Sequence, residues 1–310
     1  MLSSKAAASG TSGAYGGVRK HGPGARTPVA TFFNTSRKGV KLMYEEPYRW
    51  IEAVANRRTY LDDQFSQGNP LVAVSFAKGI LLLTVNRGTE KVYEIYDRIA
   101  LGGMGHPADL EKLRYTLLDM AHVEGFQRSP SDVTVSRLMK NGLAPVIKQA
   151  FEEIFKAPYI TKILLAEVGT TQDRDRIFSI NYDGMYEEQK EFGLLAASSS
   201  IRESLVEKWR AQERPTSLQK ALEVSLRLWG IASLLQASTS SSDTEEGEIA
   251  SSSTEVVSTI PDDEAITSRI QETLAKETLE CVLLDRESGK METYHSLTQS
   301  ELQPLIPQYF

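Results

Sequence analysis

Residues 69–106 alternate between short apolar runs and turn residues, a pattern typical of paired β-strands. Leu71–Phe76 and Ile80–Val85 are rich in β-branched and large apolar residues and lie three residues apart, which predicts a hairpin. A second pair, Val92–Tyr96 and Ile99–Gly103, follows after another turn. Ile80–Val85 is apolar at nearly every position, so helices or a second sheet should cover both of its faces.

Other segments repeat apolar residues every three or four positions, which predicts amphipathic helices. These helices cover Pro47–Phe65, Ala108–Gly125, Val133–Phe155, Ile201–Gln212 and Ser217–Leu235. Gly142 and Pro145 predict an irregularity inside the third of them. Three more strands are expected at Ile160–Val168, Arg176–Tyr182 and Phe192–Ala196, with a turn at Asp183–Gly184.

The order of these elements indicates the fold class. Strands come in blocks and helices in pairs, which argues against a doubly wound parallel sheet. The order favours an α+β fold of two antiparallel sheets covered by helix pairs. Gly103–Ala108 reads as G-x-G-x-x-A after a strand, but a second helix follows where a dinucleotide fold needs a parallel strand. We therefore expect no cofactor.

Composition excludes several functions. The net charge of −6 gives no basic surface for nucleic acid. The single cysteine, Cys281, forms no disulfide within the chain, and the four histidines lack metal-ligand spacing. No apolar run reaches the roughly 18 residues that a membrane helix needs. We expect a soluble, cytoplasmic protein without a metal and without a membrane or nucleic-acid partner.

The two ends differ from the middle in composition. Residues 1–42 carry seven Lys or Arg and no acid, so residues 1–44 are expected to be a disordered basic tail. Three interpretations compete for this tail. Two are an organelle transit peptide and a solvated basic tail. The third, which we favour, is a start codon assigned too early, with translation from Met43. Residues 238–264 carry eight acids and no base, which predicts a solvated linker over 237–264. Residues 265–310 should form a small extension of one helix and a hairpin, too short for a core of its own and expected to dock elsewhere or stay partly disordered.

Several short motifs then occur in a recognisable order. They are Glu90–Ala100 (EKVYEIYDRIA), Gly105 with Ala108–Asp109, Ser131–Thr134 (SDVT), Ala166–Val168 (AEV) and Tyr182–Gly184 (YDG). In this order they resemble α-type subunits of bacterial 20S proteasomes over residues 45–236. The resemblance implies a four-layer αββα sandwich of the N-terminal-nucleophile hydrolase class, assembled into seven-membered rings.

The resemblance also bears on catalysis. Catalytic β-type subunits of this family carry a threonine after a glycine, freed by autocleavage as the nucleophile. The matching pair here is Gly68–Asn69, and Asn69 has no hydroxyl. The family's catalytic acid falls at Val85, and Lys91 matches its lysine. Ser66 and Ser75 lie nearby and are interpreted as structural, so we expect no catalytic residues.

The resemblance implies a role in a larger assembly. The partners would be a homo-oligomeric α ring, a heptamer in this family, catalytic β-type subunits and a proteasomal AAA ATPase. Residues ahead of Pro47 would gate substrate entry. Lys91, with Gly105 as a backbone donor, would bind the C-terminal carboxylate of the ATPase, a contact worth roughly 1.5–3 kcal/mol.

Three hypotheses remain open from the sequence. The favoured one is a non-catalytic, gating α-ring subunit of a proteasome core. The others are a divergent catalytic self-compartmentalising hydrolase and a proteasome-like ring without protease partners. The final Gln308–Phe310 also resembles the penultimate-tyrosine tail of proteasomal ATPases, which suggests that it competes for the pocket at Lys91; a chance apolar end is the other interpretation.

Overall fold

The computed structural model describes residues 36–242, 261–288 and 292–309, with side chains from residue 49 onward except at 239–242. Residues 1–48 and 49–310 form separate units, and all side-chain contacts below lie within the second. Most of the expected basic tail and of the acidic linker lies outside the described residues. The first helix, α1, spans Ser36–Phe65 and so begins before Pro47, contrary to the sequence-based prediction. Val40–Glu46 contains good helix formers, which continue the helix ahead of Pro47 although a proline inside a helix removes one backbone donor and crowds the preceding turn.

Ten strands form two five-stranded antiparallel sheets. The first sheet has the order β10-β9-β2-β1-β8, and its strands are Tyr294–Ser296, Thr278–Asp285, Gly79–Asn86, Leu71–Phe76 and Phe192–Leu195. The second has the order β3-β4-β5-β6-β7, and its strands are Val92–Tyr96, Ile99–Gly105, Thr161–Glu167, Arg176–Ile180 and Tyr186–Gln189. Strands β1, β2 and β5 are buried along their whole length, as the nearly continuous apolar sequences of β1 and β2 require.

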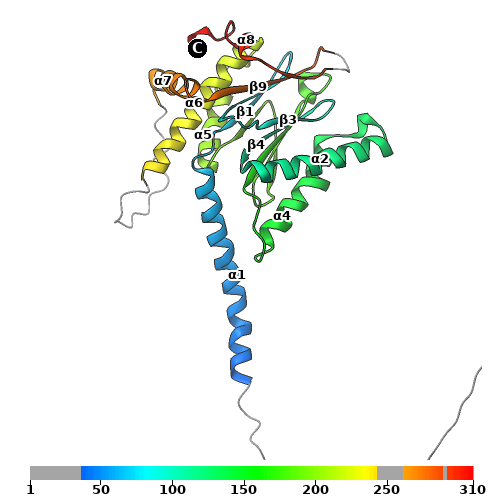
Figure 1. Ribbon diagram of the computed structural model, residues 1–310, viewed down its shortest axis with the longest axis vertical. Helices are drawn as coiled ribbons and strands as arrows, with labels where there is room; N and C mark the ends of the chain where they lie inside the picture. Colours follow the sequence, from blue (N-terminus) through cyan, green and yellow to red (C-terminus); the bar gives the residue numbers. More distant parts are fainter. Residues whose placement is uncertain (1–35, 243–260, 289–291, 310) are drawn as a thin grey trace, which may run out of the picture. The chain divides into compact units, whose positions relative to one another are not determined.

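Helices cover the outer face of each sheet (Figure 1). The first sheet carries α5, Ser199–Arg210, and α6, Leu218–Ser242, against which α7, Asp263–Leu274, packs. The second carries α2, Pro107–Gln127, and a helical run made of α3, Val135–Arg137, a π-helical turn over Leu138–Leu143, and α4, Ala144–Glu152. The π turn is the irregularity that Gly142 and Pro145 predicted.

Three apolar cores separate these four layers. One lies between α5, α6 and the first sheet, one between the two sheets, and one between the second sheet and α2 to α4. The middle core also receives Leu61 and Phe65 from the end of α1. The α+β sandwich predicted from the order of elements is thereby confirmed.

The C-terminal residues complete the first sheet. Strand β9 pairs with β2 over its full length, from Gly79 opposite Asp285 to Asn86 opposite Thr278. Gly79 is required at one end, because a Cβ there would lie 1.9 Å from the Leu284 carbonyl oxygen. The helix α8, Gln299–Leu302, and a 3₁₀ turn at Pro307–Tyr309 follow β10. The hairpin expected in this part of the chain therefore docks on the sandwich itself.

Candidate functional site

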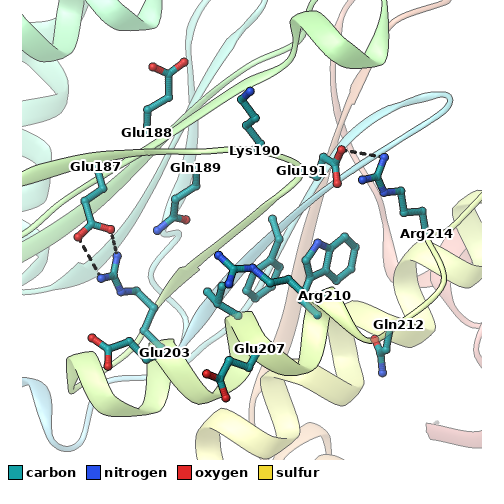
Figure 2. Close-up of a pocket in the computed structure, with 14 residues that line it drawn as sticks. Glu187, Glu188, Gln189, Lys190, Glu191, Glu203, Glu207, Arg210, Gln212 and Arg214 are labelled. Carbon is teal, nitrogen blue, oxygen red and sulfur yellow. Dashed lines mark hydrogen bonds and ion pairs between the residues drawn. The ribbon is translucent and has the colours of Figure 1, made fainter.

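A cavity of about 720 Å³ lies between the β7–β8 hairpin and α5 (Figure 2). Phe192 and Trp209 stack with their ring centroids 5.2 Å apart and contribute to its lining. Two pairs of its charged residues form salt bridges: Glu191 binds Arg214 at 2.9 Å, and Glu187 binds Arg202. None of the site residues predicted from the sequence lines this cavity. Asn69, Val85 and Lys91 lie together instead where α1 leads into β1.

Asn69 occupies the position that the resemblance gives to a nucleophile. Its side-chain amide donates to the Val85 carbonyl at 3.0 Å and to a carboxylate oxygen of Glu277 at 2.7 Å. The peptide groups beside it are fixed as well, since Gln236 donates to the Gly68 carbonyl at 2.8 Å. Asn69 therefore acts as a hydrogen-bond donor in a closed network, and it has no hydroxyl to attack a carbonyl.

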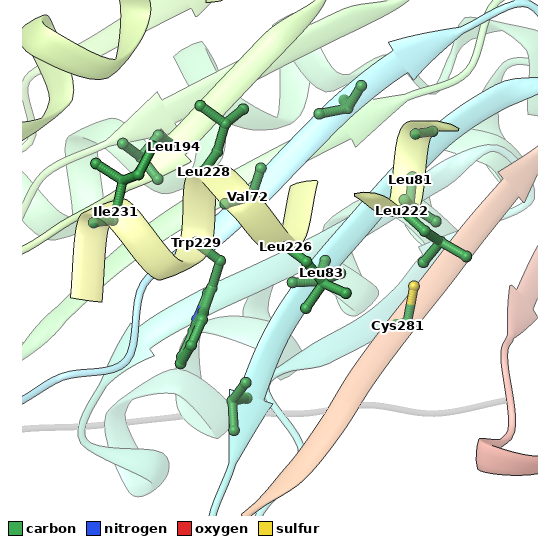
Figure 3. Close-up of a cluster of buried hydrophobic side chains, with 14 of the residues drawn as sticks. Val72, Leu81, Leu83, Leu194, Leu222, Leu226, Leu228, Trp229, Ile231 and Cys281 are labelled. Atoms are coloured by element: carbon green, nitrogen blue, oxygen red, sulfur yellow. The ribbon is translucent and has the colours of Figure 1, made fainter. Parts of the chain in front are cut away.

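Pro70 is held from both sides. Its carbonyl oxygen accepts hydrogen bonds from the Thr84 hydroxyl at 2.8 Å and from the Trp229 indole at 3.1 Å. Trp229 belongs to the core beneath α6 (Figure 3), into which the Cys281 thiol also projects beside Leu222. Burial raises the pKa of Cys281, so this thiol is not a reactive nucleophile.

Lys91 lies beside Asn69 and contacts the same carbonyl. Its ammonium donates to the Val85 carbonyl at 3.0 Å, and its own carbonyl accepts from the Gly103 amide at 2.8 Å. Burial lowers the pKa of Lys91, while the carboxylates of Glu280 and Glu277 act in the opposite direction. Lys91 is thus a half-buried cation between two acids, on a rigid part of the second sheet.

Those two acids come from the start of β9 and were not predicted from the sequence. Glu280 accepts from the backbone amides of Lys91 and Val92, at 2.7–3.0 Å, and from the Asn86 side chain at 2.7 Å. Glu277 accepts from Arg87 at 2.7 Å in addition to Asn69. Burial alone would raise the pKa of Glu277, but these hydrogen bonds outweigh burial and lower it. Glu277 and Glu280 therefore hold Asn69 and the backbone at Lys91 and Val92 by hydrogen bonds from the C-terminal part of the chain.

Gly105, the other predicted docking residue, lies at the end of β4. Its φ of 132° and the Ile160 carbonyl oxygen, 2.1 Å from where a Cβ would stand, both require glycine. Lys91 pairs with Gly103 in the adjacent strand, so Gly105 lies two residues farther along β4. The structure thus places both predicted residues along the same pair of strands.

The remaining sequence-predicted residues have structural roles. The Ser66 hydroxyl donates to the Asp63 carbonyl at 2.7 Å at the end of α1, and Ser75 donates to Asp175 at 2.6 Å inside the sandwich. Tyr309 packs against the core beneath α6 and α7, and Gln271 of α7 donates to the Gln308 carbonyl at 2.9 Å. Within this chain, Gln308 and Tyr309 therefore lie on α7 and not at Lys91; Phe310 lies outside the described residues.

Two kinds of feature are absent from the described residues. No helix in the part of the chain that the structure describes is long and apolar enough to cross a membrane. Among the side chains that the structure describes, no group of His, Cys, Asp or Glu could hold a metal ion.

Comparison with known proteins gives a consistent family. A family model described as "Proteasome subunit" matches residues 65–236. Relatives named "Proteasome subunit alpha" include one from Actinosynnema mirum, 29% identical over 57% of this chain and 66% of its own. Others come from Frankia alni, 32% identical over 51% and 66%, and from Kineococcus radiotolerans, 29% identical over 58% and 75%. The chain spans about two thirds of the length of the first two relatives.

Proposed function

The chain belongs to the proteasome subunit family, and from this premise we propose that it is a non-catalytic α-type subunit that gates substrate entry into a proteasome core. The resemblance to bacterial α-type subunits is confirmed by relatives of that name in several actinobacteria. We attribute the activity and the partners of an α-type subunit to this chain as part of the proposal.

The observation that carries the proposal is the state of Asn69. A catalytic copy needs a hydroxyl at this position and a free amine made by cleavage before it. Asn69 supplies neither. Its side-chain amide is instead held by hydrogen bonds to the Val85 carbonyl and the Glu277 carboxylate, where a catalytic side chain would have to be free to react. This network supports a structural role for the region. It argues against the divergent-hydrolase hypothesis.

The proposed partners follow from the α-type role. The subunit would form a ring with copies of itself, seven in this family, stacked on a ring of catalytic β-type subunits. The residues ahead of Pro47 would restrict entry along the ring axis. The ring without protease partners stays open as a second hypothesis, and the experiment below distinguishes it.

We also propose that Lys91 and Gly105 receive the C-terminal carboxylate of a ring ATPase. Lys91 supports this role because its ammonium makes one hydrogen bond to the described residues, with the Val85 carbonyl. Arg87 is exposed beside it and adds a second positive charge. An arriving carboxylate would have to displace Glu277 from Arg87, so binding should be weaker than at a site without that competitor.

Native mass spectrometry of the chain co-expressed with a threonine-bearing β-type subunit tests the proposal. We expect a complex of stacked rings in which only the β-type subunit has a trimmed N-terminus. A homo-oligomer that never takes up the β-type subunit would support the ring without protease partners, and trimming of this chain before residue 69 would contradict the non-catalytic role. Lys91→Ala, with Lys78→Ala as a control on the same sandwich, tests ATPase binding separately.

A further inference from the structure

Lys162 is a buried cation that no described acid pairs with. It lies on β5 and is 8% exposed. Its ammonium donates to the carbonyls of Ala196 at 3.0 Å and Ala197 at 2.6 Å. It also lies 4.7 Å from the centroid of the Phe65 ring, a cation–π contact with the end of α1. The Tyr182 ring centroid lies 5.9 Å from it as well, and its third N–H has no oxygen or nitrogen acceptor among the residues that the structure describes.

The charged groups around Lys162 do not neutralise it. Asp62 of α1 is the acid that acts on it most strongly, and its carboxylate accepts a hydrogen bond from the Tyr182 hydroxyl at 2.8 Å rather than from this ammonium. Asp183 has a smaller effect on the pKa of Lys162 than Asp62 has, and Arg202 of α5 adds a like charge. Burial lowers the pKa of Lys162 to about 8, with Asp62 opposing that shift. Buried charges in proteins are usually paired or bind an ion, and no carboxylate of the described residues forms a direct salt bridge with this ammonium.

A cavity of about 200 Å³ lies beside this ammonium. Its polar lining consists of Lys162, Arg202, the hydroxyls of Ser179, Ser198 and Ser199, the Asn181 amide, and Glu187. Glu187 is the one acid, and both of its oxygens are held by Arg202. A water occupies about 30 Å³ of liquid, so the cavity has room for an ion of several heavy atoms.

The Asn181 side chain further restricts the kind of ion that this cavity can bind. Its carbonyl oxygen is buried and has no hydrogen-bond donor among the described residues. A fully deprotonated ion such as sulfate offers this oxygen nothing, whereas a partly protonated oxyanion offers an O–H. The lining thus combines a cation, hydroxyl donors and one unsatisfied acceptor.

We propose that this cavity is a binding site for a small, partly protonated oxyanion, of which hydrogenphosphate is the simplest. Lys162 supplies the positive charge, Ser198 and Ser199 supply hydroxyl donors, and Asn181 accepts the proton that the anion carries. The site is independent of the gating role proposed above. Because the same ammonium contacts Phe65, an anion bound here stabilises the packing of α1 on the sandwich.

Isothermal titration calorimetry of the full chain with inorganic phosphate, and with sulfate at equal ionic strength, tests the proposal. We expect saturable binding of phosphate that exceeds binding of sulfate. Lys162→Met should weaken it by at least about tenfold, because it removes a charge-assisted hydrogen bond, whereas Lys162→Arg should retain most of it. Lys148→Met, which removes an exposed lysine on α4, should leave it unchanged.

A second variant keeps Lys162 in place. Asn181→Leu should abolish the preference for phosphate over sulfate while the fold, followed by thermal melting, persists. Absence of saturable phosphate binding would overturn the proposal, as would equal affinity in the Lys162→Met and Lys148→Met proteins, which would indicate adventitious binding only. Equal binding of phosphate and sulfate by the unmodified chain would overturn the role given to Asn181.

Discussion

Replacing Arg286 with methionine should strongly destabilise the whole sandwich. Arg286 follows β9 and reaches across to Asp175, in the second sheet's β5–β6 connection, with two hydrogen bonds of 2.8 and 2.9 Å. The side chains of Arg286 and Asp175 are only 11% and 2% exposed. Arg286 also donates to the carbonyls of Gly169 and Phe76, so one residue of the C-terminal segment joins both sheets.

The expected magnitude follows from what remains after the substitution. Asp175 would keep hydrogen bonds from Ser75 and the Gly169 amide, but its charge would be buried without a cation. Removing one partner of a buried ion pair costs about 3–5 kcal/mol. Combining Arg286→Met with Asp175→Asn should cost less than the two single changes added together, since no unpaired charge then remains.

Urea unfolding of the full chain, followed by tryptophan fluorescence, measures these free energies. Arg87→Met is the matched control, because Arg87 also binds the C-terminal segment but is 72% exposed; its loss should be less than about 1 kcal/mol. A loss of similarly small size for Arg286→Met would refute the reasoning, and would mean that the C-terminal segment is not part of the cooperative core.

Three further changes have defined outcomes. Gly79→Ala should cost about 1–3 kcal/mol or more, seen as a lower melting temperature, because a Cβ would collide with the Leu284 carbonyl. Tyr182→Phe should cost about 1.5–3 kcal/mol in urea unfolding, since its hydroxyl donates to Asp62; an unchanged midpoint would contradict this. Lys162 has a folded pKa of about 8 against an ordinary 10.5. The unfolded chain then binds more protons between these values, so stability should rise with pH across this window by up to about 3 kcal/mol relative to Lys162→Met. Parallel profiles of the free energy of unfolding against pH for the unmodified chain and Lys162→Met would contradict this prediction.

Most of the fold could be predicted because its strands are locally distinctive. The bounds of β1 and β3 agree with the prediction residue for residue, since apolar runs there end in turns. Strand β7, Tyr186–Gln189, was missed because it is largely polar and lies at a sheet edge, with three of its four residues exposed. Its position depends on pairing with β6, which no local pattern encodes.

The site was only half predictable for a similar reason. Asn69 and Lys91 could be singled out because they lie in motifs that resemble the family. Glu277 and Glu280 contact them from about 190–210 residues away along the chain, and a charged residue at a strand end normally indicates a solvated surface. Lys162 had a detectable signal, a lysine directly before the apolar run Ile163–Ala166 of a buried strand. Its missing partner became evident only in three dimensions.

Peptide hydrolysis by the purified chain alone tests the central claim most directly, because the account depends on the missing hydroxyl at Asn69. We predict no hydrolysis above buffer, and none in the Asn69→Thr protein either, since Glu277 and the intact peptide before residue 69 still close the site. Hydrolysis by the unmodified chain that a threonine-directed covalent inhibitor abolishes would contradict the account.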